Sequence, residues 1–112
     1  MPARLIEIAE LQPTDTLRVE VINYYSALSN DEIKAKHGVP QVWQTNRGML
    51  ISDGNNRTGI YAKRGAKLIE VDFQDGINNI LDCFSEYLEE IVSRAEDLRK
   101  QGIFSPHDLW QA

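Results

Sequence analysis

The last third of the chain carries the clearest hydrophobic pattern. Between residues 77 and 98, apolar side chains recur at steps of three and four, which is the spacing of one face of an α-helix. Acidic side chains occupy the opposite face, and Gly102 then supplies a typical helix end. The pattern therefore predicts a long amphipathic helix over 77–98. Its apolar stripe consists of Ile77, Ile80, Leu81, Phe84, Leu88, Ile91, Val92, Ala95 and Leu98.

Four shorter segments have the pattern of β-strands, either alternating apolar and polar residues or forming brief apolar runs. These segments are 4–9, 39–45, 49–51 and 68–73. Pro40 lies near the start of the second segment, where a missing N–H is tolerated. A short polar turn over 46–48 separates the second segment from the third, so we expect these two to pair as a hairpin.

Helical spacing also occurs between the predicted strands. Apolar residues three and four apart predict a helix over 16–28, with Thr14 or Asp15 as its N-cap. After a polar break, a further helical turn is expected over 33–36 and should end at Gly38.

Together these elements predict one domain over residues 1–112, of the α/β (α+β) class. Its core should lie within 4–74 as a small mixed sheet with flanking helices. Residues 75–112 add the long C-terminal helix and a tail whose own apolar residues, within 103–110, should anchor it.

Composition places the chain among ordinary globular proteins, with 42% apolar and 26% charged residues in 112. No apolar run approaches the roughly 20 residues that span a bilayer, and the N-terminus lacks a signal-peptide pattern. Cys83 is the single cysteine, which excludes an internal disulfide and points to a reducing compartment. We therefore expect a cytoplasmic protein without a membrane partner, in which Cys83 is a buried apolar residue.

Charge is distributed unevenly along the chain. The net charge of −5 argues against general nucleic-acid binding, which needs clustered Lys and Arg. Residues 54–67, however, hold four basic side chains and no acidic one. This local excess of positive charge favours a small anionic ligand over a polymer.

The basic segment begins at a glycine turn that suits phosphate chemistry. Gly54 allows close backbone approach, and the N–H groups of the helix start that should follow have no intrahelical acceptors. Arg57 can add a bidentate contact to phosphate oxygens. A metal ion would be assisted by Asp53 or Asn55. The predicted phosphate-binding set is Asp53, Gly54, Asn55, Asn56, Arg57, Lys63 and Arg64.

The same residues also have an ordinary structural explanation. Asp-Gly-Asn-Asn is common turn-and-cap composition, and Arg57 could simply pair with an acid such as Glu70 or Asp72. No residue near the turn identifies itself as a catalyst. His37 and His107 are isolated, so no zinc or other structural metal site is expected.

The run ISDGNNRTGIYAKRGAKLIEVDF, residues 51–73, resembles the ParB/sulfiredoxin superfamily. Members carry a strand, a Gly-x-x-Arg box that opens a helix, a basic-Gly-Ala end to that helix, and another strand. The resemblance covers roughly residues 5–73. It implies that Gly54 to Arg57 form a nucleotide phosphate box, with Mg²⁺ and ATP or CTP as the implied cofactors. Family members include CTP-hydrolysing ParB proteins, ATP-using sulfiredoxins and a free-serine kinase.

The chain departs from these relatives in informative ways. Sulfiredoxins place a reactive cysteine directly after the box glycine, where this chain has Asn55. Partition-type ParB proteins add DNA-binding and dimerisation domains, which 112 residues with an acidic last helix do not supply. We therefore expect neither sulfiredoxin activity nor DNA clamping.

Two function hypotheses remain. In the first, the box binds a nucleotide or another phosphate ligand, as a binding protein or as an enzyme of phosphoryl transfer or NTP hydrolysis. In the second, the domain is a non-catalytic interaction module that forms a homodimer through the 77–98 helix.

Overall fold

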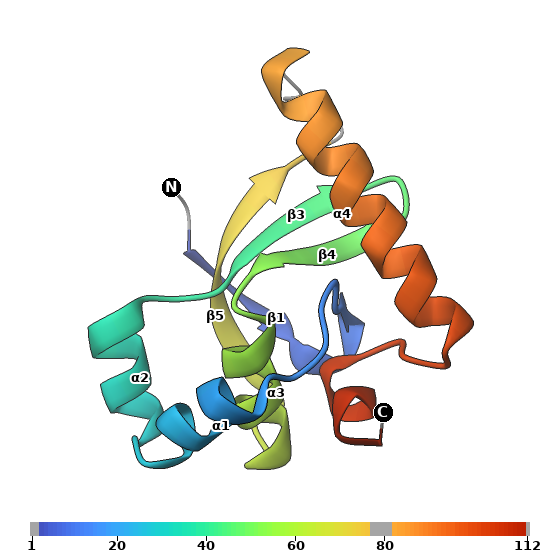
Figure 1. The fold of residues 1–112 in the computed structure, drawn as a ribbon. Coiled ribbons are helices and arrows are strands. Elements are labelled where there is room, and N and C mark those ends of the chain that lie inside the picture. Colours follow the sequence, from blue (N-terminus) through green and yellow to red (C-terminus); the bar gives the residue numbers. More distant parts are fainter. Residues whose placement is uncertain (1–2, 77–81, 112) are drawn as a thin grey trace.

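The computed structural model describes residues 3–76 and 82–111, without the side chains of 82–85 (Figure 1). Its architecture is mixed α/β, which confirms the predicted fold class. Some expectations lie outside the described residues. These are the first turns of the predicted 77–98 helix, with Ile77, Ile80 and Leu81, and the side chains of Cys83 and Phe84.

A five-stranded mixed sheet forms the centre of the fold, in the order β1-β5-β3-β4-β2. Antiparallel pairs join β1 to β5 and β3 to β4, whereas β3 and β5, like β2 and β4, are parallel. The predicted hairpin is the β3–β4 pair. The short strand β2 was not predicted from the sequence, because two residues carry no periodicity. The strands are β1 (Ala3–Glu7), β2 (Leu11–Gln12), β3 (Gln41–Thr45), β4 (Gly48–Asp53) and β5 (Leu68–Asp75).

In the part of the chain that the structure describes, four α-helices and two 3₁₀-helices pack around the sheet. The α-helices are α1 (Val19–Ser26), α2 (Asn30–His37), α3 (Asn55–Lys63) and α4 (Asp82–Lys100). The 3₁₀-helices are η1 (Ile8–Glu10) and η2 (Pro106–Gln111). Helix α2 is longer than the predicted turn because Ser29 and Glu32 form a complete capping box.

The start of α1 corrects one expectation. The helix begins at Val19 with Arg18 as N-cap, so Thr14 and Asp15 are not its cap. The physical reason is that the Thr14 hydroxyl donates instead to the Ile51 carbonyl on β4, at 2.5 Å. This bond holds residue 14 in a buried, non-helical segment.

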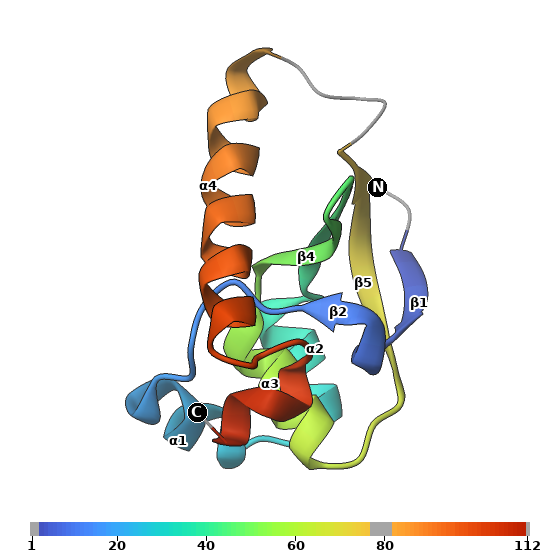
Figure 2. The same cartoon turned by 90° about the vertical axis from the view of Figure 1, so that its right-hand side faces the viewer.

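Each face of the sheet packs against different helices. Val42 and Ile51 are buried on one face, where Ile33 of α2 and Ile60 of α3 join them. The partners Trp43 and Leu50 point to the other face. Helix α4 covers that face with Leu88, Ile91 and Ala95, and Figure 2 shows it running along the sheet.

In the described part of α4, the predicted apolar stripe is therefore buried against other parts of the same chain. Leu88, Ile91, Ala95 and Leu98 are each at most 6% exposed. The hypothesis of a dimer through this helix stays a prediction, but these four side chains are not available to a second copy.

The apolar residues of the C-terminal tail predicted that it is anchored, and the structure shows that it packs onto α3. Trp110 donates its indole N–H to the Gly59 carbonyl at 2.8 Å. Ile103 and Leu109 form a buried cluster with Leu98 of α4. Among the helices that the structure describes, none is long and apolar enough to span a membrane.

Candidate functional site

Gly54 makes the sharp connection between β4 and α3. Its φ is +98°, in the left-handed region that disfavours side chains. A Cβ at this position would lie 2.9 Å from Nη2 of Arg57 and 3.0 Å from Cβ of Pro40. Glycine is therefore required both for the turn and for the space that the Arg57 side chain fills.

Arg57 is buried at 5% exposure and clamps three parts of the chain together. Its Nη1 donates to the carbonyls of His37, at 2.6 Å, and Gly38, at 3.3 Å. Its Nη2 lies 3.2 Å from an Asp53 carboxylate oxygen. The guanidinium thus holds the end of α2 against the start of α3.

The sequence also suggested that Arg57 pairs with Glu70 or Asp72. These partners are wrong, because the carboxylate that Arg57 contacts is that of Asp53. Glu70 instead accepts from Lys34 at 2.7 Å, and this contact raises the Lys34 pKa above its ordinary value. Asp72 accepts from the Gln74 amide at 3.0 Å.

The two asparagines of the turn fasten neighbouring segments with their side chains. Asn55 accepts from the Thr14 N–H at 2.9 Å and donates to the Thr14 hydroxyl at 3.1 Å. Asn56 accepts from the Arg18 N–H at 2.8 Å, which satisfies a donor at the start of α1. What the asparagines can offer to a ligand is their backbone, because the first N–H groups of α3 have no intrahelical acceptors.

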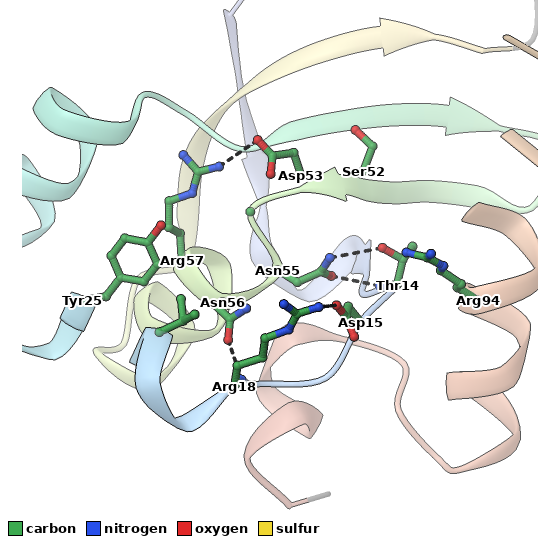
Figure 3. Close-up of a pocket in the computed structure, with 12 residues that line it drawn as sticks. Thr14, Asp15, Arg18, Tyr25, Ser52, Asp53, Asn55, Asn56, Arg57 and Arg94 are labelled. Atoms are coloured by element: carbon green, nitrogen blue, oxygen red, sulfur yellow. Dashed lines mark hydrogen bonds and ion pairs between the residues drawn. The ribbon is translucent and has the colours of Figure 1, made fainter. Parts of the chain in front are cut away.

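A polar cleft of about 230 Å³ opens above this helix start. Figure 3 shows Arg57 and Asp53 on one side of it, and Arg94 of α4 approaching from another. Its charged residues are three arginines and two aspartates, an excess of one positive charge. The lining consists of Thr14, Asp15, Arg18, Val21, Tyr25, Ser52, Asp53, Gly54, Asn55, Asn56, Arg57 and Arg94.

Two of the cleft arginines are exposed and take part in surface ion pairs. Arg18 pairs with Asp15 at 3.3 Å, and Arg94 pairs with Glu90 at 2.6 Å. Their side chains are 63% and 57% exposed. Exposed ion pairs contribute only about 0–1 kcal/mol, so an anion in the cleft can compete for both guanidinium groups.

Lys63 and Arg64 do not reach this cleft. They lie at the far end of α3, roughly 12 Å along the helix from Asn55. Lys63 sits 4.1 Å above the Trp110 ring, and Arg64 donates to the Asn30 side chain at 2.8 Å. The structure therefore brings together five of the seven predicted phosphate-binding residues and separates these two.

Sequence reasoning missed Thr14, Arg18 and Arg94 as members of the cleft. The sequence offered one weak indication of Arg94, because it is a basic residue surrounded by acidic residues in the last helix. Thr14 and Arg18 had none beyond their polar type. Their place depends on how the segment before α1 folds back over α3.

Burial and charge also act on Tyr61 of α3, which is 7% exposed. Burial raises the pKa of its phenol, and the nearby positive charge of Arg57 opposes that rise. Tyr61 is therefore neutral at physiological pH and adds no negative charge near the box.

No metal centre built from protein side chains alone is found in the described part of the chain. There, no group of three or more His, Cys, Asp or Glu side chains comes close enough to hold an ion. Asp15 and Asp53 are the carboxylates that line the cleft. One or two carboxylates suffice for Mg²⁺ when a ligand's phosphates and water complete its shell.

Comparison with protein-family models and with curated proteins gives no match to this chain. Membership of the ParB/sulfiredoxin superfamily stays a prediction.

Proposed function

We propose that this protein binds a small phosphate-containing ligand, such as a nucleotide, in the cleft at the start of α3. The observation that carries the proposal is the convergence of three arginines on a helix N-terminus within one cleft. A helix start attracts anions through its unpaired N–H groups and its dipole, by about 0.3–1 kcal/mol. Guanidinium groups add charge-assisted hydrogen bonds, which are roughly twice as strong as neutral ones.

The size of the cleft indicates which part of the ligand it would enclose. Pockets that enclose drug-sized molecules measure about 300–1,000 Å³, whereas this cleft holds about 230 Å³. It suits one or more phosphate groups, with the remainder of a nucleotide lying outside. Recognition would therefore depend on phosphate more than on the base.

The proposed roles differ among the arginines. Arg57 is fully engaged with His37, Gly38 and Asp53, so it positions the box and contributes its charge. Arg18 and Arg94 are the movable groups that would contact the phosphates. Mg²⁺, if it accompanies the ligand, would be held by Asp53 or Asp15 together with phosphate oxygens.

Phosphoryl transfer and NTP hydrolysis stay predictions within this proposal. Either reaction needs a group that orients or deprotonates the attacking oxygen. The cleft carboxylates, Asp15 and Asp53, are the candidates for that role. A place in the ParB/sulfiredoxin superfamily would agree with nucleotide binding at Gly54 to Arg57, and we include it in the proposal.

Isothermal titration calorimetry with phosphate, pyrophosphate, ATP and CTP, each with and without Mg²⁺, tests the proposal. Arg18→Ala and Arg94→Ala should each weaken binding by about tenfold or more, because each removes a charge-assisted contact. Arg47→Ala is the matched control, an exposed arginine on the β3–β4 turn, and should leave affinity unchanged.

Two results would overturn the proposal. One is a wild-type protein that shows neither heat nor a thermal shift with any of these ligands. The other is ligand binding that is lost equally in the Arg47 control and in the cleft variants, because binding would then reflect overall charge.

A further inference from the structure

Strand β1 lies at the outer edge of the sheet with one side open. Figure 2 shows no ribbon of the described chain beyond it. The other edge strand, β2, has only two residues and both are buried. Natural sheets protect a long edge by charge, proline, a bulge or a covering segment. In β1, the Arg4 guanidinium lies over the Phe73 ring, 4.2 Å from its centre, and does not cover the edge.

The backbone groups on the open side of β1 can be identified from the ladder with β5. The register pairs Ala3 with Asp72 and Glu7 with Leu68, and the Ile8 N–H donates to the Lys67 carbonyl at 2.9 Å. Hydrogen-bonded pairs alternate along an antiparallel ladder, so Ile6 and Arg4 bond to β5 as well. The N–H groups of Ala3, Leu5 and Glu7 therefore point outward, and within residues 3–76 and 82–111 no acceptor meets them.

Exposed leucines gather at the same edge. Leu5 is 69% exposed and Leu68 is 53% exposed, and both are among the few large apolar side chains exposed at the described surface. Since Leu68 is the partner of Glu7, two residues from Leu5, the leucines lie on one face of the sheet as diagonal neighbours.

We propose that β1 joins two copies of this chain, antiparallel about a two-fold axis at Leu5, into one continuous sheet. In this register Leu5 faces Leu5 of the second copy and exchanges both of its hydrogen bonds with it. Each Glu7 N–H meets an Ala3 carbonyl, which gives about four hydrogen bonds in all. The Glu7 carbonyl is not available to the second copy. Glu7 is the N-cap of η1, and its carbonyl accepts the first hydrogen bond of that helix.

The sequence of β1 is complementary to itself in this register and in no neighbouring one. Arg4 faces Ile6 and Glu7 faces Ala3, so no like charges are opposed. A shift that centres the pair on Arg4 sets two arginines face to face. A shift that centres it on Ile6 leaves Ala3 without a partner. This self-complementarity is the reason to assign the edge to a second copy and not to a foreign strand.

Sedimentation velocity of the full chain over a concentration series tests the proposal. The wild type should show a monomer–dimer equilibrium. Leu5→Lys places two like charges opposite each other at the axis and should raise the dimer dissociation constant by about tenfold or more. Val19→Lys is the matched control, because Val19 is 73% exposed on α1, and should leave the dimer intact.

A charge-pair experiment separates this interface from any other. Leu5→Lys and Leu5→Glu should each be monomeric alone and should associate when mixed, because residue 5 faces residue 5 across the axis. Circular dichroism of each variant confirms that it is folded. A wild type that stays monomeric at the highest workable concentration would overturn the proposal, as would a dimer that Leu5→Lys does not weaken. Neither outcome bears on ligand binding in the cleft, which uses other residues.

Discussion

The guanidinium of Arg57 donates a hydrogen bond to the His37 carbonyl across 2.6 Å, and this bond joins the start of α3 to the end of α2. The glycine turn that opens α3 is thus held by an arginine whose hydrogen bonds are already satisfied by protein groups. Its charge reaches the cleft, while its donors serve the fold.

Replacing Arg57 should therefore cost stability as well as function. Arg57→Ala leaves the His37 and Gly38 carbonyls without this donor and opens a space beside Gly54. The free energy of unfolding should fall by about 3 kcal/mol, because bonds to a buried charged donor are lost. Urea denaturation measures this change. Arg64→Ala, an exposed arginine just beyond the same helix, should cost less than about 1 kcal/mol. Equal losses in the two variants would contradict the clamp.

Gly54 should tolerate a methyl group less well than another glycine with positive φ. Gly54→Ala combines an unfavourable left-handed conformation with contacts of 2.9 and 3.0 Å to Arg57 and Pro40. Gly102 has φ +85° and open space around it, so Gly102→Ala isolates the backbone cost of about 1–2 kcal/mol. We expect Gly54→Ala to exceed that control by about 1 kcal/mol or more in thermal or urea unfolding. Matching values would mean that the Arg57 side chain moves aside freely.

Asn55 and Thr14 should behave as an energetically coupled pair. The hydrogen bond from the Asn55 amide to the Thr14 hydroxyl predicts a coupling of about 1 kcal/mol in a double-mutant cycle of Asn55→Ala and Thr14→Val. The valine keeps the backbone N–H that donates to Asn55, so that second bond does not enter the cycle. Thr45→Val in the β3–β4 hairpin shares no partner with Asn55, so its combination with Asn55→Ala should be additive within about 0.5 kcal/mol. Additivity in the Thr14 cycle would argue against the side-chain hydrogen bond between Asn55 and Thr14.

The capping box of α2 predicts a dependence of stability on acid. The backbone N–H of Ser29, and then its hydroxyl, hold the pKa of Glu32 below its ordinary value of 4.5. A carboxylate whose pKa is lowered on folding stabilises the protein above the unfolded pKa, and this contribution is lost as pH falls through the folded pKa. Glu32→Gln should therefore be less stable than the wild type at pH 7, and the difference should shrink below pH 4.5. Chemical denaturation of both proteins from pH 7 to pH 3 measures it, and a difference that does not change with pH would contradict the prediction.

The sequence determined the local elements where periodicity or turn chemistry was strong. The apolar stripe of α4, the β3–β4 hairpin and the glycine start of α3 were each predicted from residues next to one another in the chain, because helix and strand periods and turn preferences are local properties. The α/β class followed from those elements. The start of α1 was predicted wrongly, because the bond from Thr14 to Ile51 depends on a strand 37 positions away.

The tertiary structure alone decided which residues form the cleft. Arg18 and Arg94 are 76 positions apart, and only the packing of α4 on Trp43 and Leu50 brings the second toward the start of α3. Lys63 is close to the glycine turn in sequence, yet a helix of nine residues carries it to the opposite end. The sequence thus located the glycine turn, while helix rise and sheet packing chose the charges that surround it.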